Sequence, residues 1–400
     1  MSEAFGAGGR DTDGGQADTG HTNGGDSTRR ADLAALGAAW TTSRAVVVGS
    51  LVMAHVVADT IGPMRRAVPQ HLGRGLLDWD AERYFQIASK GYGALPRIQL
   101  RFFPLVPLAA RALDRVLPGG AGAALLVLAN LSALALGWLV LRLVVHEGGD
   151  AATARTAVWL VFFTPAAFVL AWGYTEPVWG CLCVGMFLAL RRRQWWAAAA
   201  VGLLAGLTRP VAPLLVVPAL VEAARGWRSW LRSGQWRAIA ARVAAVASPV
   251  AGVGVYLWWV WANYGNALLP YRIQQGPKFR GSLTDPFTPI LHTAGAAFGA
   301  DGGLAALRVM WAAVLVVLVV LALRWWPASY GLFAAAVVLV ALSTQRLGSF
   351  ERYGFSAFPV VLALAVLVRK RPGALPAAIA VGAAAVMGYG TLALLGSYVP

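Results

Sequence analysis

Charge is scarce in this chain. Only 13% of its 400 residues are Asp, Glu, Lys or Arg, whereas soluble domains carry about 25%. Hydrophobic residues make up 58%, and the mean hydropathy is +0.61. This composition excludes an ordinary soluble domain, because only lipid can solvate so much apolar surface. The sequence therefore predicts an all-α integral membrane protein with many crossings.

Acidic residues, cysteine and histidine are also few. The chain has 18 Asp and Glu against 34 Lys and Arg. The arginines cluster between apolar runs, which favours positive-inside topology over a nucleic-acid partner. Cys181 and Cys183 lie two apart in one apolar run, so we expect packing residues rather than a disulfide or metal site. The five histidines are scattered, and the motifs of soluble nucleotide-binding and hydrolytic enzymes are absent.

The chain divides into a polar tail and a membrane domain. Residues 1–35 are rich in Gly, Asp, Thr and Ser, which predicts a disordered cytoplasmic tail. Residues 36–400 form the polytopic membrane domain, for which we expect about eleven transmembrane segments. These segments are expected at 42–61, 121–145, 154–173, 177–190, 195–222 as a hairpin of two, 243–262, 304–324, 328–343, 355–368 and 374–397.

The hairpin follows from the placement of the arginines. Residues 195–222 have basic residues on both flanks and are interrupted at Arg209, so two short helices keep both flanks inside. With the N-terminus in the cytoplasm of a multi-pass cell-membrane protein, four connections then lie outside. They are 63–120, 174–176, 263–303 and 343–353.

The first of these outer connections carries the most polar stretch of the membrane domain. Residues 77–93 read LDWDAERYFQIASKGYG. The apolar positions Ala81, Tyr84, Phe85 and Ala88 predict one face of a short interfacial helix that Gly91 ends. A second amphipathic helix is expected at 104–117. Asp78 and Asp80 then lie at the start of the first helix, where Asp80 is either a functional carboxylate or only an N-cap.

Other polar residues of the outer face allow two interpretations each. Tyr174 and Glu176 break two hydrophobic runs, as a binding element or as a capped turn before proline. Arg209 lies deep in apolar sequence, where an arginine costs about 2.5–3.5 kcal/mol, so it serves a site or a structural ion pair. Arg346 and Arg352 can bind a phosphate or extend to the membrane interface. Lys278 and Arg280 are weaker candidates.

Asp78-Trp79-Asp80 also matches a short acid-x-acid pattern that holds a divalent ion under a nucleotide sugar. Three residues are weak evidence, and the outward location argues against a cytoplasmic nucleotide sugar. We therefore expect no metal or other cofactor, and a divalent ion at Asp78 and Asp80 is the unfavoured alternative.

Five stretches, in order over about 75–370, resemble the PIG-V-type mannosyltransferases, polytopic glycosyltransferases of the GT-C superfamily. The matching residues are Trp79-Asp80 with Tyr84 and Gly91-Tyr92, Arg101-Phe102-Phe103-Pro104, Pro165-Ala166-Ala167-Phe168 before Tyr174-Thr175-Glu176, Leu207-Thr208-Arg209-Pro210, and Arg352-Tyr353 before Phe358-Pro359. The chain departs from the pattern at Arg83 and Pro177, which bears on the substrate more than on the reaction.

The resemblance implies a GT-C-type bundle that transfers mannose, or another hexose, with inversion. The donor would be a polyprenyl-phosphate sugar in the bilayer, and the acceptor a glycolipid, glycan or protein outside the cytoplasm. Carried over to this sequence, the general base is Asp80. The cations for the donor phosphate are Arg209, Arg346 and Arg352. The expected substrate-binding residues are Asp78, Trp79, Tyr84, Tyr174 and Glu176.

The competing interpretation is a transporter or lipid flippase with a broken-helix site at Arg209. The absence of an internal repeat and the long aromatic first loop count against it.

Overall fold

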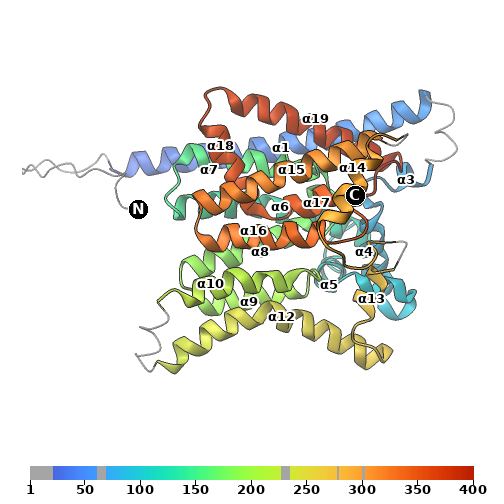
Figure 1. Cartoon of the computed structure of the whole chain (residues 1–400), viewed down its shortest axis with the longest axis horizontal. Helices are drawn as coiled ribbons and strands as arrows, with labels where there is room; N and C mark the ends of the chain where they lie inside the picture. Colours follow the sequence, from blue (N-terminus) through green and yellow to red (C-terminus); the bar gives the residue numbers. More distant parts are fainter. Residues whose placement is uncertain (1–20, 61–68, 227–234, 277–278, 300–301) are drawn as a thin grey trace, which may run out of the picture.

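The computed structural model describes residues 21–60, 69–226, 235–276, 279–299 and 302–400. Within these ranges the chain is all-helical, apart from one isolated antiparallel bridge between Leu283 and Thr344. The helices lie side by side as a bundle with the long axis horizontal in Figure 1. This confirms the prediction of an all-α fold with the character of an integral membrane protein.

Among the residues that the structure describes, five helices are long and apolar enough to cross a membrane. They are α1 (His21–Thr60, apolar from Ser27), α6 (Gly120–His146), α12 (Trp236–Tyr264), α15 (Gly302–Trp325) and α19 (Ala374–Leu394).

Six shorter helices occupy the positions of the other expected segments. They are α7 (Ala151–Phe162), α8 (Glu176–Arg191), α9 (Trp195–Gly206), α10 (Val216–Ala224), α16 (Ala328–Leu342) and α18 (Phe358–Arg369). Every expected segment thus has a helix at its place. The count of about eleven membrane crossings remains a prediction, because these six helices are short.

The helix α1 begins at His21, inside the segment 1–35 that the sequence predicted to be disordered. Residues 21–35 are therefore a correction to that boundary, while residues 1–20 lie outside the described part of the chain. Arg155 on α7 lies 3.3 Å from Asp32, and Leu36 is buried. These contacts hold the part of α1 around Asp32 and Leu36 against the bundle.

The basic connections gather at one end of the bundle, which we call the basic end (left in Figure 1). There Arg191, at the end of α8, contacts Glu147 at 2.7 Å and Glu222 of α10 at 3.1 Å. Arg209, between α9 and α10, instead contacts Glu176 at the other end of α8. The segment 195–222 therefore enters and leaves at the basic end, as the predicted hairpin requires.

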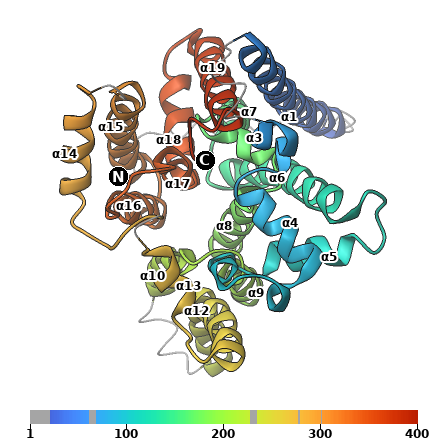
Figure 2. The same ribbon diagram turned by 90° about the vertical axis from the view of Figure 1, so that its right-hand side faces the viewer.

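The opposite end, which we call the site end, carries short helices from three of the four connections that the sequence placed outside (Figures 1 and 2). These helices are α3 (Pro69–Arg74), α4 (Asp80–Lys90), α5 (Leu105–Leu113), α13 (Leu269–Gln274), α14 (Phe287–Ala296) and α17 (Phe350–Phe355).

The helix α4 has the predicted bounds but a rotated apolar face. Ala81, Tyr84, Ile87 and Ala88 are buried against α5 and α6, whereas Phe85 is 37% exposed. The sequence assigned Phe85 to the apolar stripe of an interfacial helix and did not include Ile87, which the structure buries. Because α4 packs on two protein helices rather than on a flat surface, Ile87 completes its buried face. The neighbouring α5 confirms the second amphipathic helix, four residues shorter than predicted at its end.

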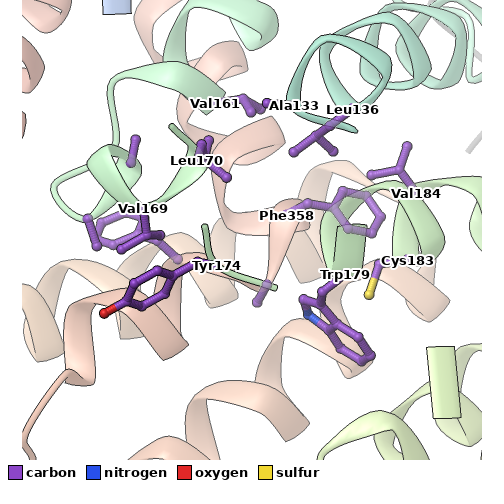
Figure 3. Packing of buried hydrophobic residues seen from close by; sticks show 14 of the residues in the cluster. Ala133, Leu136, Val161, Val169, Leu170, Tyr174, Trp179, Cys183, Val184 and Phe358 are labelled. Atoms are coloured by element: carbon purple, nitrogen blue, oxygen red, sulfur yellow. The ribbon is translucent and has the colours of Figure 1, made fainter. Parts of the chain in front are cut away.

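The core lies around α8, next to the site end. Figure 3 shows Trp179, Cys183 and Val184 of α8 packed with Leu136 of α6 and Phe358 of α18. Cys181 and Cys183 are free thiols, as the sequence predicted. This dense apolar layer anchors the beginning of α8 and of α18, the two helices next to the charged residues of the site end.

Candidate active site

The turn Asp78-Trp79-Asp80 is strained and held from two sides. Trp79 has a φ of 56°, a conformation that costs a non-glycine residue about 1–3 kcal/mol. Its indole Nε1 donates to Ala393 O at 3.0 Å. The backbone N–H of Asp80 donates to Tyr174 Oη at 3.3 Å. These contacts from α19 and from the residues before α8 fix where the Asp80 side chain emerges.

Asp80 does not cap its helix. The cap position is Trp79, and no side chain there accepts from the helix. Instead the Asp80 carboxylate lies 2.8 Å from Nη1 of Arg352, on α17. The interpretation of Asp80 as only an N-cap was therefore wrong.

Arg352 belongs to a chain of alternating charges. Its Nε lies 3.3 Å from Oε1 of Glu176, and Nη2 of Arg209 lies 3.0 Å from the same oxygen. The side chains of Arg352, Glu176 and Arg209 are only 4–7% exposed, while that of Asp80 is 25% exposed. The structure thus joins four residues from four separate segments, all predicted from the sequence as site residues.

Three of these residues keep unused hydrogen-bonding capacity. Arg209 Nη1, Arg352 Nε and both carboxylate oxygens of Glu176 are buried but make no aligned hydrogen bond with any described residue. The contacts of Glu176 are therefore close charge pairs rather than well-directed hydrogen bonds. A buried donor left in this state costs about 1–3 kcal/mol, so the cluster is better suited to binding a polar ligand than to stabilising the fold.

Three further residues complete the charged site, and the sequence indicated them weakly at most. Arg352 Nη2 donates to the Tyr353 hydroxyl at 2.8 Å. The Arg280 guanidinium lies 3.6 Å from the Tyr353 ring centre. Arg101 lies over the rings of Phe102 and Phe279, at 4.5 and 4.1 Å. Arg101 and Tyr353 were only parts of the resembling motifs, and Arg280 was a weak candidate.

Arg280 is positioned by a short clamp between two outer connections. Arg346 N–H donates to Arg280 O at 3.1 Å, and Thr284 N–H donates to Ser343 O at 3.2 Å. Gly281 within this clamp has a φ of +73° and lies against Gln345. The clamp explains why residues far apart in sequence share one wall of the site.

Asp80 lies where two cavities meet. One, of about 290 Å³, is bordered by apolar residues of the hairpin turn and by Leu283 and Val340. The other, of about 500 Å³, is polar and is bordered by His71, Asp78 and Ser349. Five residues border both cavities: Asp80, Arg101, Gln274, Arg280 and Tyr353. An apolar cavity next to a polar cavity suits two substrates, one of which is a lipid.

The arginines set the protonation of the site. Burial raises the pKa of Asp80, but Arg352, Arg101 and Arg209 lower it by more, so its pKa lies below the ordinary value. Burial likewise raises the pKa of Tyr353, and Arg352, Arg280 and Arg209 outweigh it and lower that pKa. Asp80 is therefore a carboxylate at neutral pH and can accept a proton.

The remaining predicted residues take different places around the site. Tyr84 borders the apolar cavity, and its hydroxyl lies 3.5 Å from Thr175 Oγ1. Trp79 and the exposed Arg346 border the polar cavity. Tyr174 supports the start of α4 from below. Lys278 lies outside the described residues.

The two carboxylates of the acid-x-acid pattern, Asp78 and Asp80, contact different residues. The Asp78 carboxylate is fully buried and contacts His71 at 2.6 Å, whereas Asp80 contacts Arg352. Among the residues that the structure describes, no group of three His, Cys, Asp or Glu side chains could hold a metal ion. The two carboxylates thus have separate partners.

Comparison with known families gives a match over most of the membrane domain. The sequence model of glycosyltransferase family 87 matches residues 102–347, more than half of the chain. The chain belongs to glycosyltransferase family 87. No curated protein matches it. The matched residues include Glu176, Arg209 and Arg280, while Asp80 lies before the match and Arg352 lies after it.

Membership of family 87 confirms the coarser part of the sequence interpretation, a membrane glycosyltransferase. The PIG-V-type resemblance is not confirmed, because the match is to another glycosyltransferase family. The transporter alternative loses its support, since the broken helix at Arg209 occurs here within a glycosyltransferase family.

Proposed function

We propose that this family 87 glycosyltransferase moves a mannosyl residue, with inversion, from a polyprenyl-phosphate donor to an acceptor hydroxyl. The observation that carries the proposal is the position of Asp80, a carboxylate at the junction of an apolar and a polar cavity, beside buried arginines. The sugar identity rests on the PIG-V-type resemblance alone.

The apolar cavity suits the polyprenyl chain. Its apolar lining comes largely from the turn of the α9–α10 hairpin, and Leu283 at its border is 66% exposed. The neighbouring α14 exposes Phe287 and Leu291, at 75% and 70%. Apolar side chains exposed at this level are suited to contact with lipid, so a donor can reach the cavity sideways from the bilayer.

The donor phosphate then lies among the arginines. Arg209 Nη1 is buried without an aligned partner, and Arg280 is held over Tyr353. Charge-assisted hydrogen bonds to phosphate are short and about twice as strong as neutral ones. Arg346, at the exposed border of the polar cavity, is the outermost of the proposed phosphate-binding residues.

The acceptor approaches Asp80 from the polar cavity. One oxygen of Asp80 contacts Arg352, and the other makes no hydrogen bond with a described residue. That oxygen takes the proton of the acceptor hydroxyl as the hydroxyl oxygen bonds to the anomeric carbon. The bond from this carbon to the phosphate oxygen breaks on the opposite face, and the arginines stabilise the departing polyprenyl phosphate.

The charge distribution supports a site that faces away from the cytoplasm. Arg192 and Arg193, Arg225, and the cluster at 369–371 lie at the basic end, opposite Asp80. Cytoplasmic connections carry the excess of Lys and Arg in membrane proteins. The acceptor would then be a glycolipid, a glycan or a protein on the outer side.

The test is donor selection by the purified full-length protein. With a detergent extract of membranes from a strain that lacks the protein, radiolabelled polyprenyl-phosphate mannose should label a product. GDP-mannose should not serve as direct donor, and a chelator should leave the rate unchanged. Transfer from GDP-mannose in the absence of any lipid carrier would contradict the proposal. Loss of transfer in chelator would restore the acid-x-acid metal interpretation.

A further inference from the structure

The polar cavity contains a second organised pair that the transfer step above does not use. His71 Nδ1 lies 2.6 Å from Asp78 Oδ2, and the Asp78 side chain is 1% exposed. Arg74 lies 3.5 Å from the other carboxylate oxygen. Since a carboxylate only accepts hydrogen bonds, Nδ1 carries the proton. Asp78 therefore fixes which nitrogen of His71 remains a free acceptor in the neutral ring.

The plane of the imidazole is fixed as well. The His71 ring stacks on Trp79, with centroids 4.6 Å apart and an angle of 18°. Trp79 is itself held by its bond to Ala393. A ring with one nitrogen bound to a buried carboxylate and one face on a held indole has a single orientation. Such double restraint is typical of imidazoles that present the other nitrogen to a ligand.

The other nitrogen, Nε2, is left available. It makes no hydrogen bond with any residue in the described part of the chain, and it is not among the buried unpaired atoms there. His71 borders the same polar cavity as Asp80. A Cβ added to Gly396 would lie 3.2 Å from Nε2, so glycine at this position keeps the edge of the ring uncovered.

We propose that His71, oriented by Asp78, binds a hydroxyl group of the acceptor through Nε2. This inference rests on the proposed function, because it assigns the polar cavity to the acceptor. Asp80 takes the proton of the attacking hydroxyl, and His71 accepts a hydrogen bond from another. The acceptor class is therefore a polyol, a sugar with at least two free hydroxyl groups, rather than an unglycosylated protein side chain. His71 then selects which hydroxyl reaches Asp80.

Two substitutions of His71 separate acceptor binding from a purely structural role. Asn places an amide N–H at the position of Nδ1, so His71→Asn keeps the contact with Asp78 and removes Nε2. Gln places a polar atom near Nε2, so His71→Gln keeps the acceptor-facing group and loses the contact with Asp78. A structural role predicts that His71→Asn resembles wild type and that His71→Gln is the damaged variant. Acceptor binding predicts the reverse.

The assay uses polyprenyl-phosphate mannose as the fixed donor and titrates the detergent extract of membranes that lack the protein. For His71→Asn we expect the half-saturating amount of extract to rise about tenfold, the usual effect of one lost hydrogen bond. Saturating extract should restore most of the maximal rate. A half-saturating amount equal to that of wild type would overturn the inference, as would a fall in maximal rate alone.

A second variant reaches Nε2 without altering His71. Gly396→Ala should cover the edge of the ring and raise the half-saturating amount in the same way. Gly396 has a φ of +73°, so alanine also strains the backbone there. Gly373→Ala is the matched control, because Gly373 has a φ of +74° and open space, at the basic end. Equal behaviour of the two alanine variants would count against the inference. If wild-type protein transfers nothing from this donor, the proposed function itself fails.

Discussion

Arg352 is shared between two carboxylates, and this sharing makes the roles of those carboxylates separable. If Asp80 loses its charge, Arg352 still lies 3.3 Å from Glu176. If Glu176 loses its charge, two buried arginines lose their common partner. Breaking a buried ion pair on one side costs about 3–5 kcal/mol. A substitution at Asp80 therefore tests chemistry, whereas a substitution at Glu176 tests folding as well.

Asp80→Asn should leave the protein folded and should reduce transfer about 10²- to 10⁴-fold, the usual contribution of a positioned general base. Asn is nearly isosteric and can still accept from Arg352. Folding is checked by size-exclusion chromatography, and transfer by labelling from polyprenyl-phosphate mannose. Asp114→Asn, in the same loop after α5, is the control for loss of a carboxylate. Near-normal transfer by Asp80→Asn would show that Asp80 is not the general base.

The pH profile tests the electrostatics of the same residue. Because arginines lower the pKa of Asp80, the carboxylate stays deprotonated at a lower pH than an ordinary Asp, whose pKa is about 3.9. The acid limb of kcat/KM should therefore lie below this value in the wild type. In Arg352→Gln the main lowering charge is gone, so the limb should move to higher pH. If kcat/KM falls at the same acidic pH in both proteins, a group other than Asp80 controls this fall.

At the scale of elements, sequence patterns predicted the features that depend on neighbouring residues, such as where a helix begins and ends. The helix α4 begins and ends where its carboxylate and Gly91 indicated, and the hairpin broke where Thr208-Arg209-Pro210 interrupted the apolar run. The role of Asp80 as an ion-pair partner could not come from such a pattern. A carboxylate at a helix start is usually a cap, and its actual partner is 272 residues away.

The clamp between residues 280–284 and 343–346 is a second contact that the sequence pattern could not predict. It depends on backbone hydrogen bonds between two outer connections, and neither connection has the alternation of a strand. Arg280 and Tyr353 meet only because the clamp forms. Their sequence signal was limited to a positive charge in a loop and to an arginine–tyrosine pair, which occur in many unrelated contexts.

Gly281→Ala should open this clamp. A Cβ at Gly281 would collide with the Gln345 side chain, and the φ of +73° already disfavours alanine. We expect a lower thermal midpoint and reduced transfer, because Arg280 is displaced from Tyr353. Gly265→Ala is the control, since Gly265 has a φ of +75° with nothing within 4 Å. If both variants lose the same activity, backbone strain rather than the clamp would explain the effect.

At the scale of the whole molecule, the bundle has two chemically distinct ends, and their orientation in the membrane remains a prediction. Single cysteines at Ala94 and Gly299, both exposed at the site end, should react with an impermeant thiol reagent in intact cells. A cysteine at exposed Pro372, at the basic end, should react only after permeabilisation. Replacing Cys181 and Cys183 by Ala gives the background. The opposite pattern would place Asp80 in the cytoplasm.

The glycine contact between α9 and α12 has a consequence for how the protein is made. A Cβ on Gly206 or Gly252 would collide with backbone of the other helix, so the two helices touch without intervening side chains. The hairpin helices have only 12 and 9 residues, too few to hold a place in the bilayer independently. We therefore expect the hairpin to insert stably only after α12, which leaves the ribosome later. We expect Arg209, the proposed phosphate-binding residue at its turn, to reach its final depth only when that later helix has inserted.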